Sequence, residues 1–140
     1  MASPQTGAQT GCPWLSQGTA AAALHGDVSV TVDVPNTGEG SCKFSRRQAP
    51  ADSLQILVSR TTLTPCPAKS TKLSGIGNDA ASCTLHGPRG QKVEMVSSRV
   101  RDLHFTVTLT ARAQKSSSKS PDLQQDALEQ VAEQVAGSLY

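Results

Sequence analysis

The side chains with the widest range of possible chemistry in this chain are those of four cysteines: Cys12, Cys42, Cys66 and Cys83. A zinc ribbon or a thioredoxin-like redox site needs two cysteines close together, and no C-x-x-C pair and no histidine at ligand spacing accompanies them. An even number of well-separated cysteines favours two disulfides, which form in oxidising compartments. We therefore predict structural cysteines in an exported protein, with no metal site.

Four cysteines allow three pairings, and their order along the chain does not select one of them. We predict Cys12–Cys42 and Cys66–Cys83. The first bond would fasten the entry to an N-terminal helix onto a strand, and the second would close a long loop over 61–79 that shows no clear period. Each closure would stabilise the fold by roughly 3–4 kcal/mol.

Hydrolytic chemistry would need an activated nucleophile, and neither a Gly-x-Ser-x-Gly elbow nor a cysteine with a histidine partner occurs. His86 and His104 would meet if their strands paired, which keeps a small extracytoplasmic hydrolase as the alternative function. Asp33 and Glu94 fall on predicted water-facing positions, which argues against a buried acid/base pair. We predict no catalytic residue and no cofactor, and favour a protein that is not an enzyme.

A face rich in hydroxyl groups is the other candidate site. Alternation along the predicted strands places several uncharged polar side chains on one side of a sheet, interrupted by Leu57. This face is either a docking surface or an ordinary solvated sheet face. The candidate binding residues are Thr31, Gln55, His104, Thr106 and Thr108.

Charge and aromatic content limit the partners. Aromatic residues make up 3% of the chain, which leaves little for stacking on bases and argues against nucleic acid. No apolar run approaches the roughly 18 residues of a membrane span. Basic residues near strand ends either gather at one rim, where they would attract an anionic polymer or membrane surface, or are scattered solubilising charges. They are Lys43, Arg46, Arg47, Arg60, Arg99 and Arg101.

The elements that would position these residues are mostly strands. Apolar and polar residues alternate with a period of two over several segments separated by turn residues, which predicts an antiparallel sheet of five or six strands. The predicted strands cover 28–34, 41–47, 54–60, 83–86, 92–99 and 103–110.

Two helices complete the predicted α+β fold. A short one begins near Ser16 or Thr19 and ends before Gly26, which can take the left-handed stop conformation. The second opens at 120–122 with a capping hydroxyl, a proline and a carboxylate, and repeats apolar residues every four positions up to Leu139. Its apolar stripe should lie across the apolar face of the sheet.

The domain organisation is simple. Residues 1–11 read as a flexible tether, and residues 12–140 as a single α+β domain. The start lacks the charged and apolar parts of a signal peptide, so we expect that an export signal, with or without a lipid-carrying cysteine, precedes this segment in the native precursor.

Five segments in order carry a resemblance to a known family: Cys12-Pro13 before an alanine-rich helix, Cys42-Lys43-Phe44, Gly75-Ile76-Gly77-Asn78-Asp79-Ala80, the strand Phe105 to Leu109, and the helix 128–139. The chain resembles exported bacterial lipoproteins of unassigned function over most of residues 12–139. Family members often carry a Gly-x-Gly-Asp-Glu-Ala type segment, where this chain has Asn78-Asp79. The resemblance implies a small sheet with packed helices, similar to the extrinsic photosystem II subunit fold, and no catalytic residues.

The sequence thus predicts an exported, non-enzymatic binding or interaction domain. Its location would be extracytoplasmic, either periplasmic, secreted or lipid-anchored. The expected kind of partner is a protein or a component of the cell envelope, and the ligand itself is not defined by the sequence.

Overall fold

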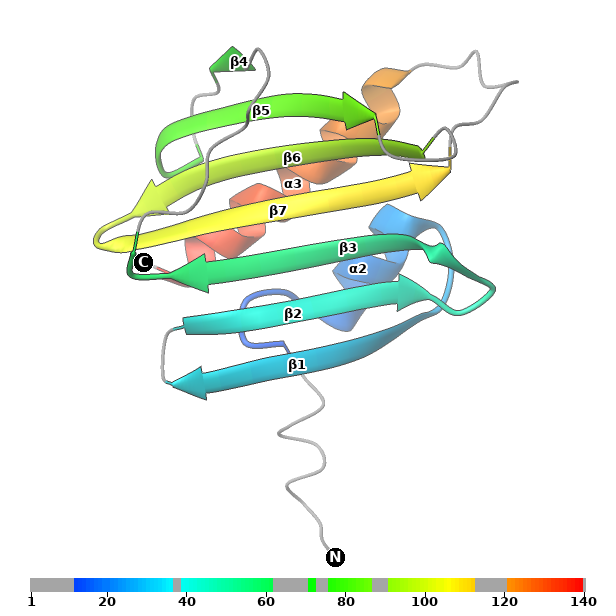
Figure 1. Ribbon diagram of the computed structural model, residues 1–140, viewed down its shortest axis with the longest axis horizontal. Helices are drawn as coiled ribbons and strands as arrows, with labels where there is room; N and C mark the ends of the chain where they lie inside the picture. The colour runs from blue at the N-terminus through cyan, green and yellow to red at the C-terminus, as the bar shows by residue number, and fades with distance from the viewer. Residues whose placement is uncertain are drawn as a thin grey trace, which may run out of the picture.

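The computed structural model describes residues 12–36, 39–61, 71–72, 76–86, 91–112 and 121–139. These residues form one antiparallel sheet and two helices (Figure 1), so the predicted α+β fold is confirmed. The strands follow the hydrogen-bonded order β1-β2-β3-β7-β6-β5-β4. The elements are α2 (Gln17–Leu24), β1 (Val28–Asn36), β2 (Glu39–Arg46), β3 (Ala49–Ser59), β4 (Thr71–Lys72), β5 (Asn78–His86), β6 (Gln91–Val100), β7 (Leu103–Arg112) and α3 (Pro121–Leu139).

The short strand β4 is the element that the sequence did not predict. It lies in the segment 61–79, which we expected to be a loop, and pairs with Ser82 and Ala81 of β5. Two residues are too few for a visible alternation of apolar and polar side chains. β4 therefore forms through pairing with β5 rather than through a local pattern.

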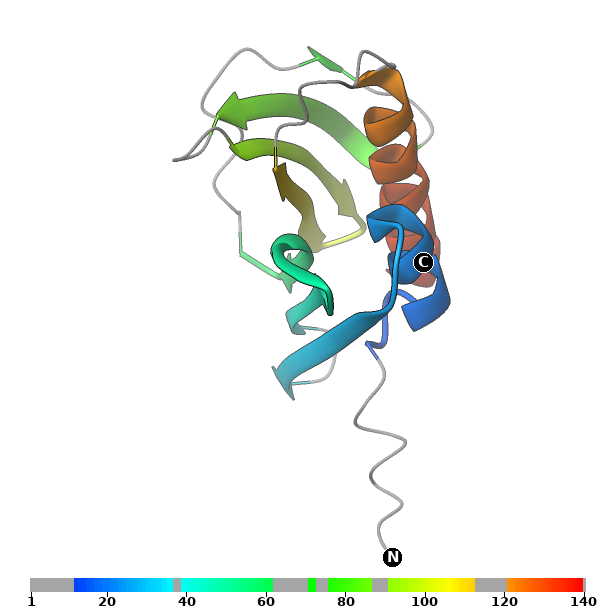
Figure 2. The same ribbon diagram turned by 90° about the vertical axis from the view of Figure 1, so that its right-hand side faces the viewer.

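Both helices lie on the same side of the sheet (Figure 2). α3 contacts β6 and β7, while α2 contacts β1, β2, β3 and α3. Residues that are direct register partners in a sheet share a face, so the pairing assigns the regularly paired strand positions to one of two faces. We call the side under the helices the helix-covered face and the other side the hydroxyl-rich face.

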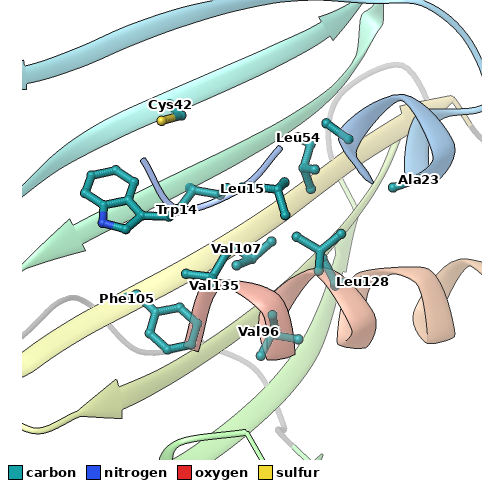
Figure 3. Packing of buried hydrophobic residues seen from close by; sticks show 14 of the residues in the cluster. Trp14, Leu15, Ala23, Cys42, Leu54, Val96, Phe105, Val107, Leu128 and Val135 are labelled. Atoms are coloured by element: carbon teal, nitrogen blue, oxygen red, sulfur yellow. The ribbon is translucent and has the colours of Figure 1, made fainter. Parts of the chain in front are cut away.

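The hydrophobic core lies between the helix-covered face and the helices. Figure 3 shows Leu128 and Val135 of α3 beside Val107 of β7. Trp14 and Leu15, which precede α2, enter the same core, where Leu15 lies beside Leu54 of β3. The four-residue repeat of α3 is confirmed over the part with described side chains, where Val131, Val135 and Leu139 are buried, as are Leu128 and Ala132 beside them. No described helix is apolar enough over its length to cross a membrane.

The two ends of α2 follow from specific residues. Ser16 caps the first turn, since its hydroxyl accepts a hydrogen bond from the main-chain N–H of Thr19 at 3.1 Å. The stop differs from our prediction: His25, and not Gly26, adopts the left-handed conformation, with φ of 63°. Gly26 serves packing instead, because a Cβ at that position would lie 2.8 Å from Nε of Arg46.

Candidate functional site

The cysteines of the described residues are structural. Cys12 and Cys42 form a disulfide with a Cα–Cα distance of 5.9 Å, so this predicted pair is confirmed. Cys83 is also disulfide-bonded, and its predicted partner Cys66 lies outside the described residues. Within the part that the structure describes, no cysteine is free and no group of histidine, cysteine and carboxylate side chains is arranged to hold a metal ion.

The hydroxyl-rich face brings most of the predicted binding residues into one row. Thr31 is the register partner of Lys43, which pairs with Gln55 of β3, which in turn pairs with Thr108 of β7. The row thus crosses four adjacent strands. Hydroxyl, ammonium and amide groups stand side by side along it, at the spacing of neighbouring strands, about 4.8 Å.

The next row of the hydroxyl-rich face is centred on Leu57. Its register partners are Ser41 of β2 and Thr106 of β7. Leu57 is 38% exposed, and it is the only large hydrophobic side chain among the described residues that is this open to solvent. Thr106, which we predicted as part of a binding face, is only 7% exposed and offers little surface to a partner.

His104 stands at one end of the hydroxyl-rich face, between its register partners Ser59 and Arg99. The turn between β6 and β7 and the residue after β3 lie at the same end. The opposite end of the sheet carries the turn between β2 and β3, where Arg46 forms an ion pair with Asp52 at 3.5 Å. The basic residues therefore do not share one rim: Arg60, Arg99 and Arg101 lie at the first end, Arg46 and Arg47 at the second, and Lys43 between them.

His86 and His104 do not form the site that the hydrolase alternative requires. Their strands are not neighbours, because β6 lies between β5 and β7. His86 pairs with Lys92, whose partner on β7 is Ala111. Ala111 and His104 are seven residues apart on β7, which corresponds to about 23 Å along the strand. The two histidine positions therefore lie at opposite ends of the sheet.

Glu94 is a buried carboxylate, contrary to our prediction that it faces water. It is 5% exposed, and its register partner on the helix-covered face is Leu109. Lys92 lies on the same face, with Nζ 3.3 Å from Oε2 of Glu94. The other carboxylate oxygen, Oε1, is buried without a hydrogen-bond partner. The period-two pattern was ambiguous here because apolar residues occupy both parities of β6, Val93 on one and Val96 on the other.

This arrangement predicts that the Lys92–Glu94 pair weakens the fold. A buried carboxylate with one unsatisfied oxygen costs free energy, and removing its cationic partner costs more. We expect Lys92→Met to lower the free energy of unfolding by about 2 kcal/mol. The double variant Lys92→Met/Glu94→Met should regain this loss and exceed the wild type by about 1 kcal/mol. Urea unfolding of the four proteins of the cycle measures both values.

A double variant less stable than Lys92→Met alone would contradict this interpretation of Glu94. Such a result would mean that the carboxylate makes a favourable interaction that methionine cannot replace. The single variant Glu94→Met is the matched control, since it removes the carboxylate and leaves Lys92, whose side chain is 27% exposed and can reach water.

Comparison with known proteins assigns no family and no function to these residues. No protein-family model, curated protein or solved structure matches the chain. The resemblance to exported bacterial lipoproteins therefore stays a prediction.

Proposed function

We propose that this protein is an exported, non-enzymatic binding domain that engages a partner protein through the hydroxyl-rich face around Leu57. The observation that supports this proposal is the exposure of Leu57. An apolar side chain surrounded by hydroxyl and amide groups is the arrangement of an interface with a dry centre and a polar rim. Ser41 and Thr106 flank Leu57 across the sheet, and Gln55 and Ser59 flank it along β3.

The chemistry of this face favours a protein over a polysaccharide or a nucleic acid. Sugar rings and bases are usually held by exposed aromatic rings. Among the described residues, Trp14, Phe44 and Phe105 are all buried in the core. The face instead offers hydroxyl groups, the amide of Gln55 and the ammonium of Lys43, which pair with the polar groups of a protein surface.

The disulfides support export. Cys12–Cys42 and the bond of Cys83 need an oxidising environment to form and persist. We propose a periplasmic, secreted or lipid-anchored location, in agreement with the resemblance to exported lipoproteins. Enzymatic activity forms no part of the proposal, because the two histidines of the hydrolase alternative lie at opposite ends of the sheet.

The test uses a photo-crosslinking amino acid at position 57 in the exported protein. The matched control carries the same amino acid at Gln130, which is exposed on α3, on the other side of the sheet. We expect one partner protein to be captured from position 57. Leu57→Glu should weaken binding of that purified partner by about tenfold or more, while Gln130→Glu should change it little.

Equal capture from positions 57 and 130, or unchanged partner affinity in Leu57→Glu, would overturn the proposed face. Because Leu57 is exposed, the charged substitution leaves the core intact, so lost binding would not reflect unfolding. Circular dichroism of each variant confirms this point.

A further inference from the structure

The outer edge of β1, which no strand among the described residues pairs with, is the second candidate binding surface. β1 is the terminal strand of the sheet and lies at its lower edge in Figure 1. The main-chain N–H of Arg47 donates to the carbonyl of Asp27 at 2.8 Å, directly before the first register pair of β1 and β2. In an antiparallel pair the residues alternate between bonding toward and away from the partner strand. The main-chain groups of Val28, Val30 and Val32 therefore point away from β2.

One end of this edge is closed by side chains. The carbonyl of Val28 accepts hydrogen bonds from Nε2 of Gln17 at 3.0 Å and from Nε of Arg47 at 3.3 Å. At the other end the register of β1 shifts between Asp33 and Asn36. The regular part of the edge whose main-chain groups have no partner among the described residues is thus confined to Val30 and Val32 and the residues between and beside them.

The opposite edge of the sheet is formed by the short strand β4, which covers part of β5. β4 pairs with Ala81 and Ser82 of β5, and the next residue, Cys83, is disulfide-bonded. Proteins commonly cover or block edge strands to prevent pairing with other chains. Among the described residues, no strand pairs with the outer edge of β1.

We propose that a second copy of this chain pairs with β1 about a two-fold axis at Thr31. This register places Val30 opposite Val32 of the partner subunit, so both strands use their outward N–H and C=O groups in about four hydrogen bonds. The half-buried valines Val30 and Val32 meet on the helix-covered side. The two sheets join into one continuous sheet.

The exposed side chains of β1 also complement one another in this register. On the hydroxyl-rich side Thr31 faces the partner's Thr31, a favourable cross-strand pair. Ser29 faces the partner's Asp33, which can accept a hydrogen bond from the serine hydroxyl. All three side chains are exposed in the single chain, and no like charges stand opposite each other. A two-fold axis at Asp33 would place two carboxylates together and is disfavoured.

Analytical ultracentrifugation of the purified chain from 10 μM to about 1 mM tests the proposal, with Thr31→Glu and Thr31→Lys as variants. Each variant alone would place like charges on the two-fold axis and should weaken dimerisation by about tenfold. An equimolar mixture of the two should restore association, because opposite charges then face each other. Gln134→Glu adds the same charge on an exposed position of α3 and should have no effect.

A second test measures a covalent crosslink between the two copies. Directly opposed residues without mutual main-chain hydrogen bonds have Cβ atoms close enough for a disulfide. Thr31→Cys should therefore give a disulfide-linked dimer under mild oxidation, whereas Ser29→Cys, opposite Asp33, should not. A wild-type chain that stays monomeric up to 1 mM, or a mixture of the charged variants that associates no better than either alone, would overturn the proposal.

Discussion

Replacing Cys12 and Cys42 together by alanine should lower the free energy of unfolding by about 3–4 kcal/mol and the melting temperature by about 10 °C. The disulfide spans 30 residues, which is a long loop to close in the unfolded chain. It also anchors the segment that carries Trp14 and Leu15 into the core (Figure 3). Urea and thermal unfolding of the wild type and the double variant measure the loss.

Adding reductant distinguishes the contribution of this bond to stability from that of the bond made by Cys83. The double variant retains the bond of Cys83, so reductant should destabilise it further, and reduced wild type should resemble the reduced double variant. An oxidised double variant as stable as the oxidised wild type would show that the segment 12–15 is held by packing alone.

The two helices and every strand except β4 were predictable from local patterns, because each pattern shows which side of the element is buried. In β7, Phe105, Val107 and Leu109 alternate with polar residues, and all three are buried. In α3 the apolar repeat identifies the buried stripe without knowledge of its partner. Such periodicity depends only on the geometry of one element, so it is readable before the fold is known.

The arrangement of the candidate site was less predictable, because it depends on strand order and register. The alternation placed Thr31, Gln55 and Thr108 on a polar side, but their single row across β1, β2, β3 and β7 exists only because β7 inserts beside β3. The same strand order separates His86 from His104. Pairing between strands far apart in sequence leaves no mark in the local pattern.

Glu94 shows a different limit to what the sequence can predict. Sequence reasoning assigns a glutamate in a strand to water, since unpaired buried carboxylates are costly. Its position on β6 is fixed instead by the residues of the same parity, Val96 and Val100, which are buried against the helices. The strand as a whole gains more from burying these valines than it loses by burying Glu94 together with Lys92.

Gly40 is the residue on which the end of the β1–β2 pair depends. Its φ of 147° lies in a region that other residues rarely adopt. A Cβ at this position would lie 2.5 Å from the carbonyl oxygen of Asp33 and 2.6 Å from Cα of Val34. Both atoms belong to the main chain of β1, so no side-chain rotation can relieve the contact. The absence of a side chain at Gly40 is what lets β1 lie against β2 where the register shifts.

We therefore expect Gly40→Ala to lower the free energy of unfolding by about 2–4 kcal/mol, through backbone strain and displacement of β1. Gly137→Ala is the matched control, since a Cβ at this position of α3 meets nothing within 4 Å. This control should raise stability by about 0.5–1 kcal/mol, because alanine favours the helix. Urea unfolding of both variants measures the difference. Equal midpoints for Gly40→Ala and the wild type would mean that β1 does not approach Gly40 in solution.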